Sequence, residues 1–307
     1  MAQKININKY IAEVKRNLGV TVSDEIIEKD LLLTLILEEF ETLGLGKELI
    51  FKGGTLLSRN YLKYHRFSED LDFVHRDSNK LREMNRSSRE KKIKEFIDFF
   101  VPKLSTIAEN LGMTFSTNRS DTKFCTILHG RTVYIFRLYY SEARFIKIEI
   151  NFVERVIHPQ KIVPIKVITD LFDSRELMFS LGLSIQNFRI SSYPIEEIII
   201  EKYRAILTRE ELKERDLFDL FFIPGALNAK SEEIVQKIKD SSLIKRELDK
   251  MIEKKLELLE RGEFFKSSER IEYLAIAKYD LEEFEKFKIK ITPKLIDICK
   301  AFLDKSP

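Results

Sequence analysis

The amino-acid sequence predicts a protein of the α+β class, with a sheet and flanking helices in residues 1–190 and an all-helical domain in residues 191–307. Two observations lead to this prediction. Before residue 190, short runs that alternate apolar and polar side chains are interspersed with segments of helical periodicity. After Tyr193-Pro194 the alternating runs stop, and from Ser231 to about Asp304 the chain is rich in Lys and Glu and helical in pattern.

The composition is typical of a soluble globular protein. Of 307 residues, 44% are hydrophobic and 34% are charged. The 53 Lys and Arg residues against 50 Asp and Glu leave a formal charge of +3, so the overall charge does not predict a nucleic-acid partner. Cys125 and Cys299 have no metal-ligand spacing, which fits a reducing compartment. Because the chain shows no secretion signal and no apolar run close to the roughly 18 residues of a membrane span, we expect a cytoplasmic protein without a membrane partner.

The elements expected in the first half alternate between helices and strands. Helices are predicted over residues 8–18 and 24–42, and Ser23 is placed to cap the second. A strand enters a glycine turn, a helix leaves it and a second strand follows, over residues 48–51, 56–62 and 70–74. An amphipathic helix then runs to Leu111, with Pro102 expected to kink or break it. Further strands are expected over 113–117, 124–128, 133–139 and 145–152, and helices over 194–208 and 210–222.

The turn Gly53-Gly54-Thr55 lies between a strand and a helix and is a candidate phosphate-binding site. Glycine lets a ligand approach the backbone closely, and a helix N-terminus favours anions. Candidate nucleotide ligands near the turn are Lys52, Thr55, Ser58, Arg66 and Ser68. The turn is neither a GxxxxGK[ST] loop nor a GxGxxG fingerprint, and an ordinary strand–helix turn is the alternative interpretation.

Three carboxylates on predicted strands are candidate metal ligands. Asp70 and Asp72 share one face of a strand. They would repel each other unless a cation or solvent screened them, and Mg²⁺ held by one or two carboxylates and by phosphate oxygens suits this arrangement. Glu149, beside Lys147 on the polar face of a later strand, is a candidate third ligand. The alternatives are an exposed edge strand for the two aspartates and a cross-strand ion pair for Lys147 and Glu149.

The helical half contains a second charged cluster. Lys202 falls within an apolar helical stripe, where a lysine is costly unless it is paired. Asp216 and Asp219, next to Arg215, are three residues apart and therefore lie on one face of a helix. A structural salt bridge between two helices and a phosphate-binding lysine are both open interpretations.

Two further charged segments are ambiguous. Glu28-Lys29-Asp30 fits either a solvated surface or a functional motif. The basic run between residues 82 and 94 is either a patch for an RNA backbone or a solvated start of a helix. The sequence contains no G-x-S-x-G, Cys–His signature or H-E-x-x-H, so hydrolase and zinc-protease functions have no support.

Taken in order, these motifs resemble the nucleotidyltransferase (polymerase-beta-like) superfamily, in which a Gly-Gly/Ser turn precedes a D-x-D strand. Within it the chain is similar to the AbiEii/AbiGii toxin family, the MenT-like toxins of abortive-infection toxin–antitoxin pairs. The matching segments are Glu28-Lys29-Asp30, Lys52-Gly53-Gly54-Thr55, Ser68-x-Asp70-Leu71-Asp72, Lys202-x-x-Ala205 and Arg215-Asp216-Leu217-x-Asp219-Leu220. They span residues 28–220, and the tail after residue 225 carries no matching motif.

The resemblance implies a mixed β-sheet core flanked by helices, which faces a helical C-terminal domain across a cleft. It implies Mg²⁺ on Asp70 and Asp72, a triphosphate among Gly53, Gly54, Thr55 and Ser68, and closure of the site by Lys202 and Asp216. Glu149 would supply the third carboxylate of the superfamily. A cognate antitoxin encoded beside the gene is also implied.

The leading hypothesis is a toxin of a type IV, AbiE-like system that transfers a nucleoside monophosphate from an NTP to an RNA acceptor, with a tRNA 3′ end as the first candidate. The metal would stabilise the charge that develops during in-line attack on the α-phosphorus, and Lys202 would neutralise the triphosphate or assist deprotonation of the acceptor. Two alternatives stay open. One is nucleotidylylation of a protein hydroxyl, including that of Ser68, and the other is a non-catalytic NTP-binding regulatory module.

Overall fold

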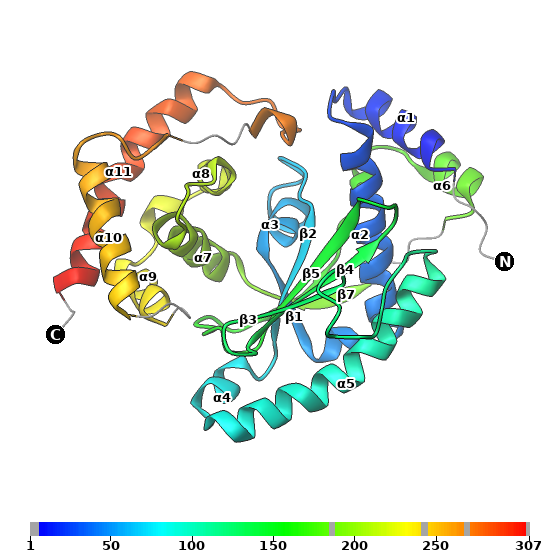
Figure 1. Ribbon diagram of the computed structural model, residues 1–307. Coiled ribbons are helices and arrows are strands. Elements are labelled where there is room, and N and C mark those ends of the chain that lie inside the picture. Colours follow the sequence, from blue (N-terminus) through cyan, green and yellow to red (C-terminus); the bar gives the residue numbers. More distant parts are fainter. Residues whose placement is uncertain (1–5, 184–187, 241–244, 267–270, 305–307) are drawn as a thin grey trace. The chain divides into compact units, whose positions relative to one another are not determined.

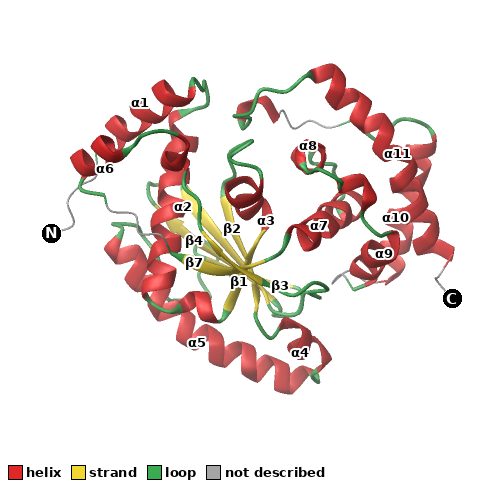
Figure 2. Ribbon diagram, turned by 180° about the vertical axis from the view of Figure 1, so that it is seen from behind, coloured by secondary structure: helices red, strands yellow, loops and turns green. Residues whose placement is uncertain are grey.

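The computed structural model describes residues 6–183, 188–240, 245–266 and 271–304 (Figure 1). The chain forms two compact units. The first comprises Met1–Glu154 and Gln160–Tyr193, and the second comprises Arg155–Pro159 and Pro194–Pro307. The first unit contains a mixed sheet with helices, and the described residues of the second form helices but no strand of the sheet, which confirms the predicted fold class (Figure 2).

The first unit is organised around one seven-stranded mixed sheet with the strand order β3-β4-β5-β2-β1-β7-β6. Strand β1 pairs antiparallel with β2 and parallel with β7, and β2 pairs parallel with β5. The strands are β1 (Leu49–Lys52), β2 (Asp70–His75), β3 (Cys125–Leu128), β4 (Val133–Tyr139), β5 (Phe145–Asn151), β6 (Lys161–Pro164) and β7 (Arg189–Ser192). The strands that carry the candidate carboxylates, β2 and β5, are therefore neighbours near the middle of the sheet.

The two faces of this sheet differ in polarity. Helices α2 (Asp24–Thr42) and α5 (Arg86–Asn110) lie on one side of it (Figures 1 and 2), where Phe40 stacks on Phe73 with ring centroids 5.3 Å apart. Phe100 of α5 packs on Phe136 of β4 at 5.4 Å. Since successive strand residues point to opposite faces, burying Phe73 against these helices places Asp72 on the other face.

The remaining helices belong to the two units as follows. The first unit also contains α1 (Ile7–Leu18), η1 (Leu45–Lys47), α3 (Gly53–Leu56), the π-helical turn η2 (Leu57–Tyr61), α4 (Ser78–Glu83), η3 (Ile168–Leu171) and α6 (Arg175–Leu181). The second contains α7 (Ile195–Thr208), α8 (Glu214–Phe222), η4 (Ala226–Asn228), α9 (Ser231–Lys239), α10 (Lys245–Glu260), η5 (Ile271–Tyr273) and α11 (Leu281–Asp304). Phe218 and Phe221 of α8 pack on Phe284 of α11, with ring centroids 5.7 and 5.4 Å apart.

Several expected elements differ in the structure. The strand expected over residues 113–117 is wrong, because this segment makes a single isolated bridge, from Thr114 to Tyr139. Helix α5 continues through Pro102 without a break. The helix expected over 56–62 begins earlier, at Gly53, and continues as the π-helical turn η2. Strands β6 and β7 and helix α6 are not among the elements that the sequence predicts.

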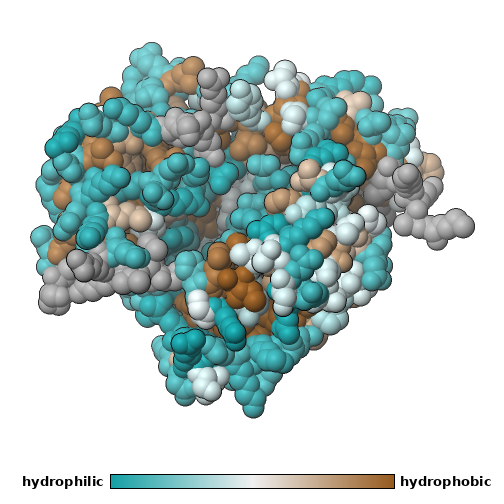
Figure 3. Space-filling model, viewed as in Figure 1, coloured by the Kyte–Doolittle hydropathy of each residue, from teal (hydrophilic) through white to brown (hydrophobic). Residues whose placement is uncertain are grey.

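On the face shown in Figure 3, hydrophilic side chains cover most of the surface. Among the described residues, no helix combines the length and the apolar character that crossing a membrane requires.

Candidate active site

Charged side chains line up across the polar face of the sheet, in register between neighbouring strands. Lys52 of β1 is the cross-strand partner of Asp72 on β2, and Asp72 is in turn the partner of Glu149 on β5. One row further, Asp70 is the partner of Lys147. The sheet pairing thus brings together five residues that are separated by up to 97 positions of sequence, here called the charged rows.

The glycine turn packs directly against these rows. Gly53 has φ = +81°, and a Cβ at this position would overlap the carboxylate of Asp72. A Cβ on Gly54 would lie 2.8 Å from Arg66 Nη2 and 2.9 Å from Ser68 Oγ. The absence of side chains at both glycines lets Asp72, Arg66 and Ser68 of the chain itself approach the backbone of the turn closely. The approach of a phosphate to this backbone stays a prediction.

The hydroxyl groups of Thr55, in the turn, and of Ser58, in η2, both donate to backbone carbonyls of the chain. Thr55 Oγ1 donates a hydrogen bond of 2.5 Å to the backbone carbonyl of Asp70, and the buried Ser58 hydroxyl donates to the backbone carbonyl of Arg66. In this arrangement both hydroxyls join the turn to the segment that leads into β2. Their geometry favours a structural role over the nucleotide contacts that the sequence suggested.

The carboxylates of Asp72 and Glu149 repel each other within the charged rows. Burial and the neighbouring charge of Asp72 raise the pKa of Glu149, and Lys147 and Lys52 only partly oppose this. Lys147 Nζ lies 3.1 Å from Asp70 Oδ2 and 3.7 Å from Glu149 Oε2. Burial alone would lower the pKa of Lys147, but the surrounding charges of Asp72, Asp70 and Glu149 raise it. The ionised form of Glu149 is thus disfavoured, and an added cation would favour it.

The donor set suits a cation that takes most of its ligands from elsewhere. Within the described part of the chain, no group of three or more His, Cys, Asp or Glu side chains is arranged to hold a metal ion. Mg²⁺ in phosphoryl-transfer sites is typically bound by one or two carboxylates together with substrate phosphates and water. Asp70 and Asp72, on one strand face beside the glycine turn, fit that requirement, whereas Glu149 does not complete a three-residue ligand set in this arrangement.

Glu154 joins the charged rows through Lys52, a contact that the sequence did not predict. It lies just after β5, pairs with Lys52 and accepts a hydrogen bond of 2.7 Å from the hydroxyl of Tyr193. Lys52 is therefore engaged by a carboxylate 102 positions away. The only signal in the sequence is the opposite charge of Lys52 and Glu154, because neither Glu154 nor Tyr193 falls in a recognisable motif.

The segment Glu28-Lys29-Asp30 of α2 connects to the site through ion pairs. Asp30 is 2% exposed and pairs with Arg59 Nη2 at 2.7 Å, so the interpretation of a solvated triplet is wrong for this residue. Lys29 pairs with Glu69 at 3.1 Å, immediately before the aspartate strand. Glu28 pairs at 3.1 Å with Arg144, which precedes β5. These contacts hold α2 to η2 and to the segments that lead into β2 and β5.

In the second unit, Lys202 of α7 joins two carboxylates of α8. Its Nζ lies 2.8 Å from Asp216 and 2.5 Å from Asp219, and all three residues are buried. Burial alone would raise the pKa of Asp216, but Lys202 and Arg209 outweigh it and lower the pKa. Arg215 is half-buried on the same helix. Within this unit, the cluster has the geometry of the interhelical salt bridge that the sequence left as one interpretation.

The basic run of residues 82–94 lies on α4 and α5 and is largely exposed. Arg86 pairs with Glu90 at 2.8 Å and Lys94 pairs with Asp98 at 2.6 Å. Part of its charge is therefore balanced within the helix, as expected for a solvated helix start.

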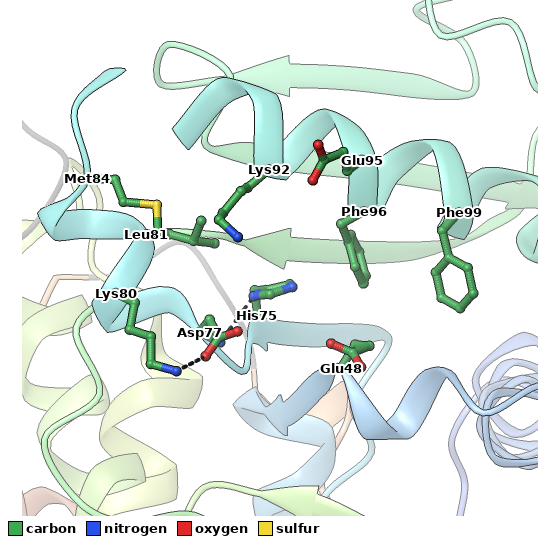
Figure 4. A pocket seen from close by; sticks show the side chains of 10 residues that line it. All are labelled: Glu48, His75, Asp77, Lys80, Leu81, Met84, Lys92, Glu95, Phe96 and Phe99. Atoms are coloured by element: carbon green, nitrogen blue, oxygen red, sulfur yellow. Dashed lines mark hydrogen bonds and ion pairs between the residues drawn. The ribbon is translucent and has the colours of Figure 1, made fainter. Parts of the chain in front are cut away.

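A cavity of about 470 Å³ lies at the His75 end of β2, away from Asp70 (Figure 4). His75 Nδ1 accepts a hydrogen bond of 3.1 Å from the backbone N–H of Asp77, and burial lowers the pKa of His75. Its ring stacks on Phe152. No sequence motif assigns this histidine a role, and its contacts are those of a packed, neutral side chain.

The chain matches one known family over most of its length. The family model described as "Nucleotidyl transferase AbiEii toxin, Type IV TA system" matches residues 35–294. No curated protein and no solved structure matches the chain. The matched region includes the glycine turn, the charged rows and the Lys202 cluster.

Proposed function

The chain belongs to the AbiEii family of nucleotidyl transferase toxins of type IV toxin–antitoxin systems, and from this premise we propose that its charged rows transfer a nucleoside monophosphate from an NTP to the 3′ end of an RNA, with tRNA as the first candidate acceptor. Membership of a toxin–antitoxin family implies a cognate antitoxin. The proposed reaction needs Mg²⁺, and Asp70 and Asp72 are the residues we assign to hold it.

One observation carries the proposal. The side chain of Asp72 occupies the space that a Cβ on Gly53 would need, so one of the two proposed metal ligands lies directly against the backbone of the glycine turn. When bound, Mg²⁺ would neutralise charge on the phosphates and orient them. The glycines would let a phosphate approach the backbone closely, and Arg66, which is buried and donates through Nη1 to the Phe67 carbonyl, adds positive charge beside Gly54.

We assign Lys202 and Asp216 a different role from the one implied by the resemblance. Lys202 already donates to Asp216 and lies within 2.5 Å of Asp219. Contact with a triphosphate would require it to leave two buried carboxylates, which is costly. We therefore propose that this cluster acts by fixing α7 against α8 within the second unit.

The test uses Asp70→Asn and Asp72→Asn, with Asp98→Asn as a matched control because Asp98 is an exposed, ion-paired aspartate on α5. Purified protein is incubated with Mg²⁺, total tRNA and each labelled NTP in turn, and the products are resolved on a denaturing gel. We expect both site variants to lose transfer while their circular dichroism is unchanged, and the control to keep transfer.

Full activity in both site variants would refute the assignment of Asp70 and Asp72. Label that appears on protein instead of RNA would identify the acceptor as a protein hydroxyl. Tight NTP binding by the wild type without any transfer would favour a regulatory module.

A further inference from the structure

The polar face of the sheet continues beyond the carboxylates onto β4. Arg137 of β4 is the cross-strand partner of Lys147, and Tyr139 is the partner of Phe145. These residues share a sheet face with Asp70, since Lys147 is in turn the partner of Asp70. At about 4.8 Å between neighbouring strands, Arg137 lies about 10 Å from Asp70, close to the length of three stacked nucleotides at about 3.4 Å each.

Two neighbouring aromatic rings on this part of the face each contact a cation. The rings of Tyr139 and Phe145 are 5.2 Å apart and both side chains are half-buried. The Arg137 guanidinium lies 5.7 Å from the ring centre of Phe145, and the Lys123 ammonium lies 4.7 Å from that of Tyr139. We call these four residues the aromatic–cation platform.

Neither cation of the platform is neutralised by a carboxylate among the described residues. Arg137 donates only to neutral oxygens, Thr126 Oγ1 at 2.9 Å and the Thr122 carbonyl at 3.3 Å. Lys123 is exposed and makes no ion pair there. This differs from the basic run on α5, where Arg86 and Lys94 are paired. The platform therefore combines two positive charges with two half-buried aromatic rings.

We propose that the aromatic–cation platform binds the single-stranded 3′ end of the RNA acceptor and leads it to the carboxylates of Asp70 and Asp72; this inference rests on the proposed function. Aromatic rings stack on the faces of unpaired bases, and lysine and arginine neutralise the backbone phosphates. In a duplex the base faces are already stacked on one another, so the rings would add nothing to its binding. An acidic peptide would use the cations but not the rings.

The test measures binding alone, without NTP, so that no transfer occurs. The probe is a fluorescein-labelled 12-nucleotide single-stranded RNA, followed by fluorescence anisotropy at several salt concentrations. Phe145→Leu removes a stacking ring and is expected to weaken binding about 5-fold to 150-fold, and Phe145→Tyr, which keeps the ring, to bind as the wild type does.

The double variant Lys123→Gln/Arg137→Gln tests the charges. We expect it to reduce the slope of log affinity against log salt by about 1.4, because each phosphate contact on a single strand contributes about 0.7. Lys91→Gln/Lys92→Gln removes two exposed cations of α5 and is the matched control, expected to leave the slope unchanged. The single variant Lys123→Gln, on an exposed side chain, keeps the test valid should loss of Arg137 disturb the strand.

Three outcomes would overturn the platform. Phe145→Leu could bind RNA as tightly as the wild type, a 12-base-pair RNA duplex could bind as tightly as the single strand, or the α5 control could lower the salt slope as much as the platform variant. The proposed function fails separately. If the wild type transfers no nucleotide but Phe145→Leu still loses RNA binding, the platform stands as an RNA site and the transfer reaction does not.

Discussion

Replacing Gly53 with alanine tests whether the glycine turn and Asp72 are built as one surface. Gly53 has φ = +81°, and an added Cβ would overlap the Asp72 carboxylate and lie 3.0 Å from Asp72 Cβ. Asp72 has little freedom to move away, because it is held in register between Lys52 on β1 and Glu149 on β5. The added methyl group must therefore displace either the turn or the carboxylate.

The expected loss has two parts. A side chain in the left-handed region costs about 1–2 kcal/mol, and forcing extra volume into a packed site costs about 1–3 kcal/mol. We therefore expect Gly53→Ala to lower the free energy of unfolding by about 2–5 kcal/mol. Gly44→Ala is the matched control, because Gly44 has φ = +71° and a Cβ there would meet nothing within 4 Å. We expect Gly44→Ala to lower the free energy of unfolding only by the cost of a side chain in the left-handed region, about 1–2 kcal/mol.

The assay compares the two variants in urea unfolding followed by circular dichroism, and in binding of a fluorescent NTP. We expect Gly53→Ala to unfold at lower urea than Gly44→Ala and to lose NTP binding, while Gly44→Ala keeps it. Equal losses of stability in both variants, with NTP binding intact in both, would refute the close packing of the turn on Asp72.

Three further predictions concern buried charges. Lys202→Met leaves Asp216 and Asp219 buried without their shared ammonium, so we expect the free energy of unfolding to fall by about 3–5 kcal/mol; an unchanged urea midpoint would contradict the salt-bridge role. Arg59→Met leaves Asp30 unpaired and is expected to cost a similar amount, about 3–5 kcal/mol, most of which a second change, Asp30→Leu, should restore in a thermal melt. Burial holds the pKa of His75 below its ordinary value of 6.5. The unfolded chain therefore takes up the proton first, and this part of the stability is lost as the pH falls below about 6.5, so His75→Gln should flatten the pH dependence of stability between about pH 7 and pH 5.

The sequence predicted those parts of the site that depend on local periodicity. Over residues 70–73 of β2 and 146–150 of β5, apolar and charged residues alternate, and the structure buries the apolar set and gathers Asp70, Asp72, Lys147 and Glu149 on the opposite face. A period of two assigns each side chain to a face whatever lies next to the strand. Which side chains of a strand share one face of the sheet could therefore be predicted without knowing the order of the strands.

Contacts between distant segments could not be derived in this way. Asp30 reads locally as part of a charged, solvated triplet, but its partner Arg59 is 29 positions away and both are buried. Strands β6 and β7 have four residues each and pair with each other across 24 residues or more, so neither contains enough alternation to stand out. Residues 113–117 show the opposite case. Their residue types favour a strand, but only Thr114 forms a bridge, to Tyr139.

The buried Asp30 and Asp216 and the half-buried Glu149 differ in the interactions that set their pKa. The pKa of Asp216 is lowered, because attraction to Lys202 and Arg209 exceeds the effect of burial. The pKa of Asp30 is raised by burial, while its neighbours Arg59 and Tyr64 act to lower it. For Glu149, burial and the like charge of Asp72 act in the same direction and raise the pKa together. A carboxyl group with a raised folded-state pKa loses its stabilising contribution as the pH rises past its ordinary range, so this repulsion weakens the fold at neutral pH. Packing alone gives no reason to place Asp72 beside Glu149, whereas a site that receives a cation with its nucleotide does, because the cation reverses the sign of the interaction.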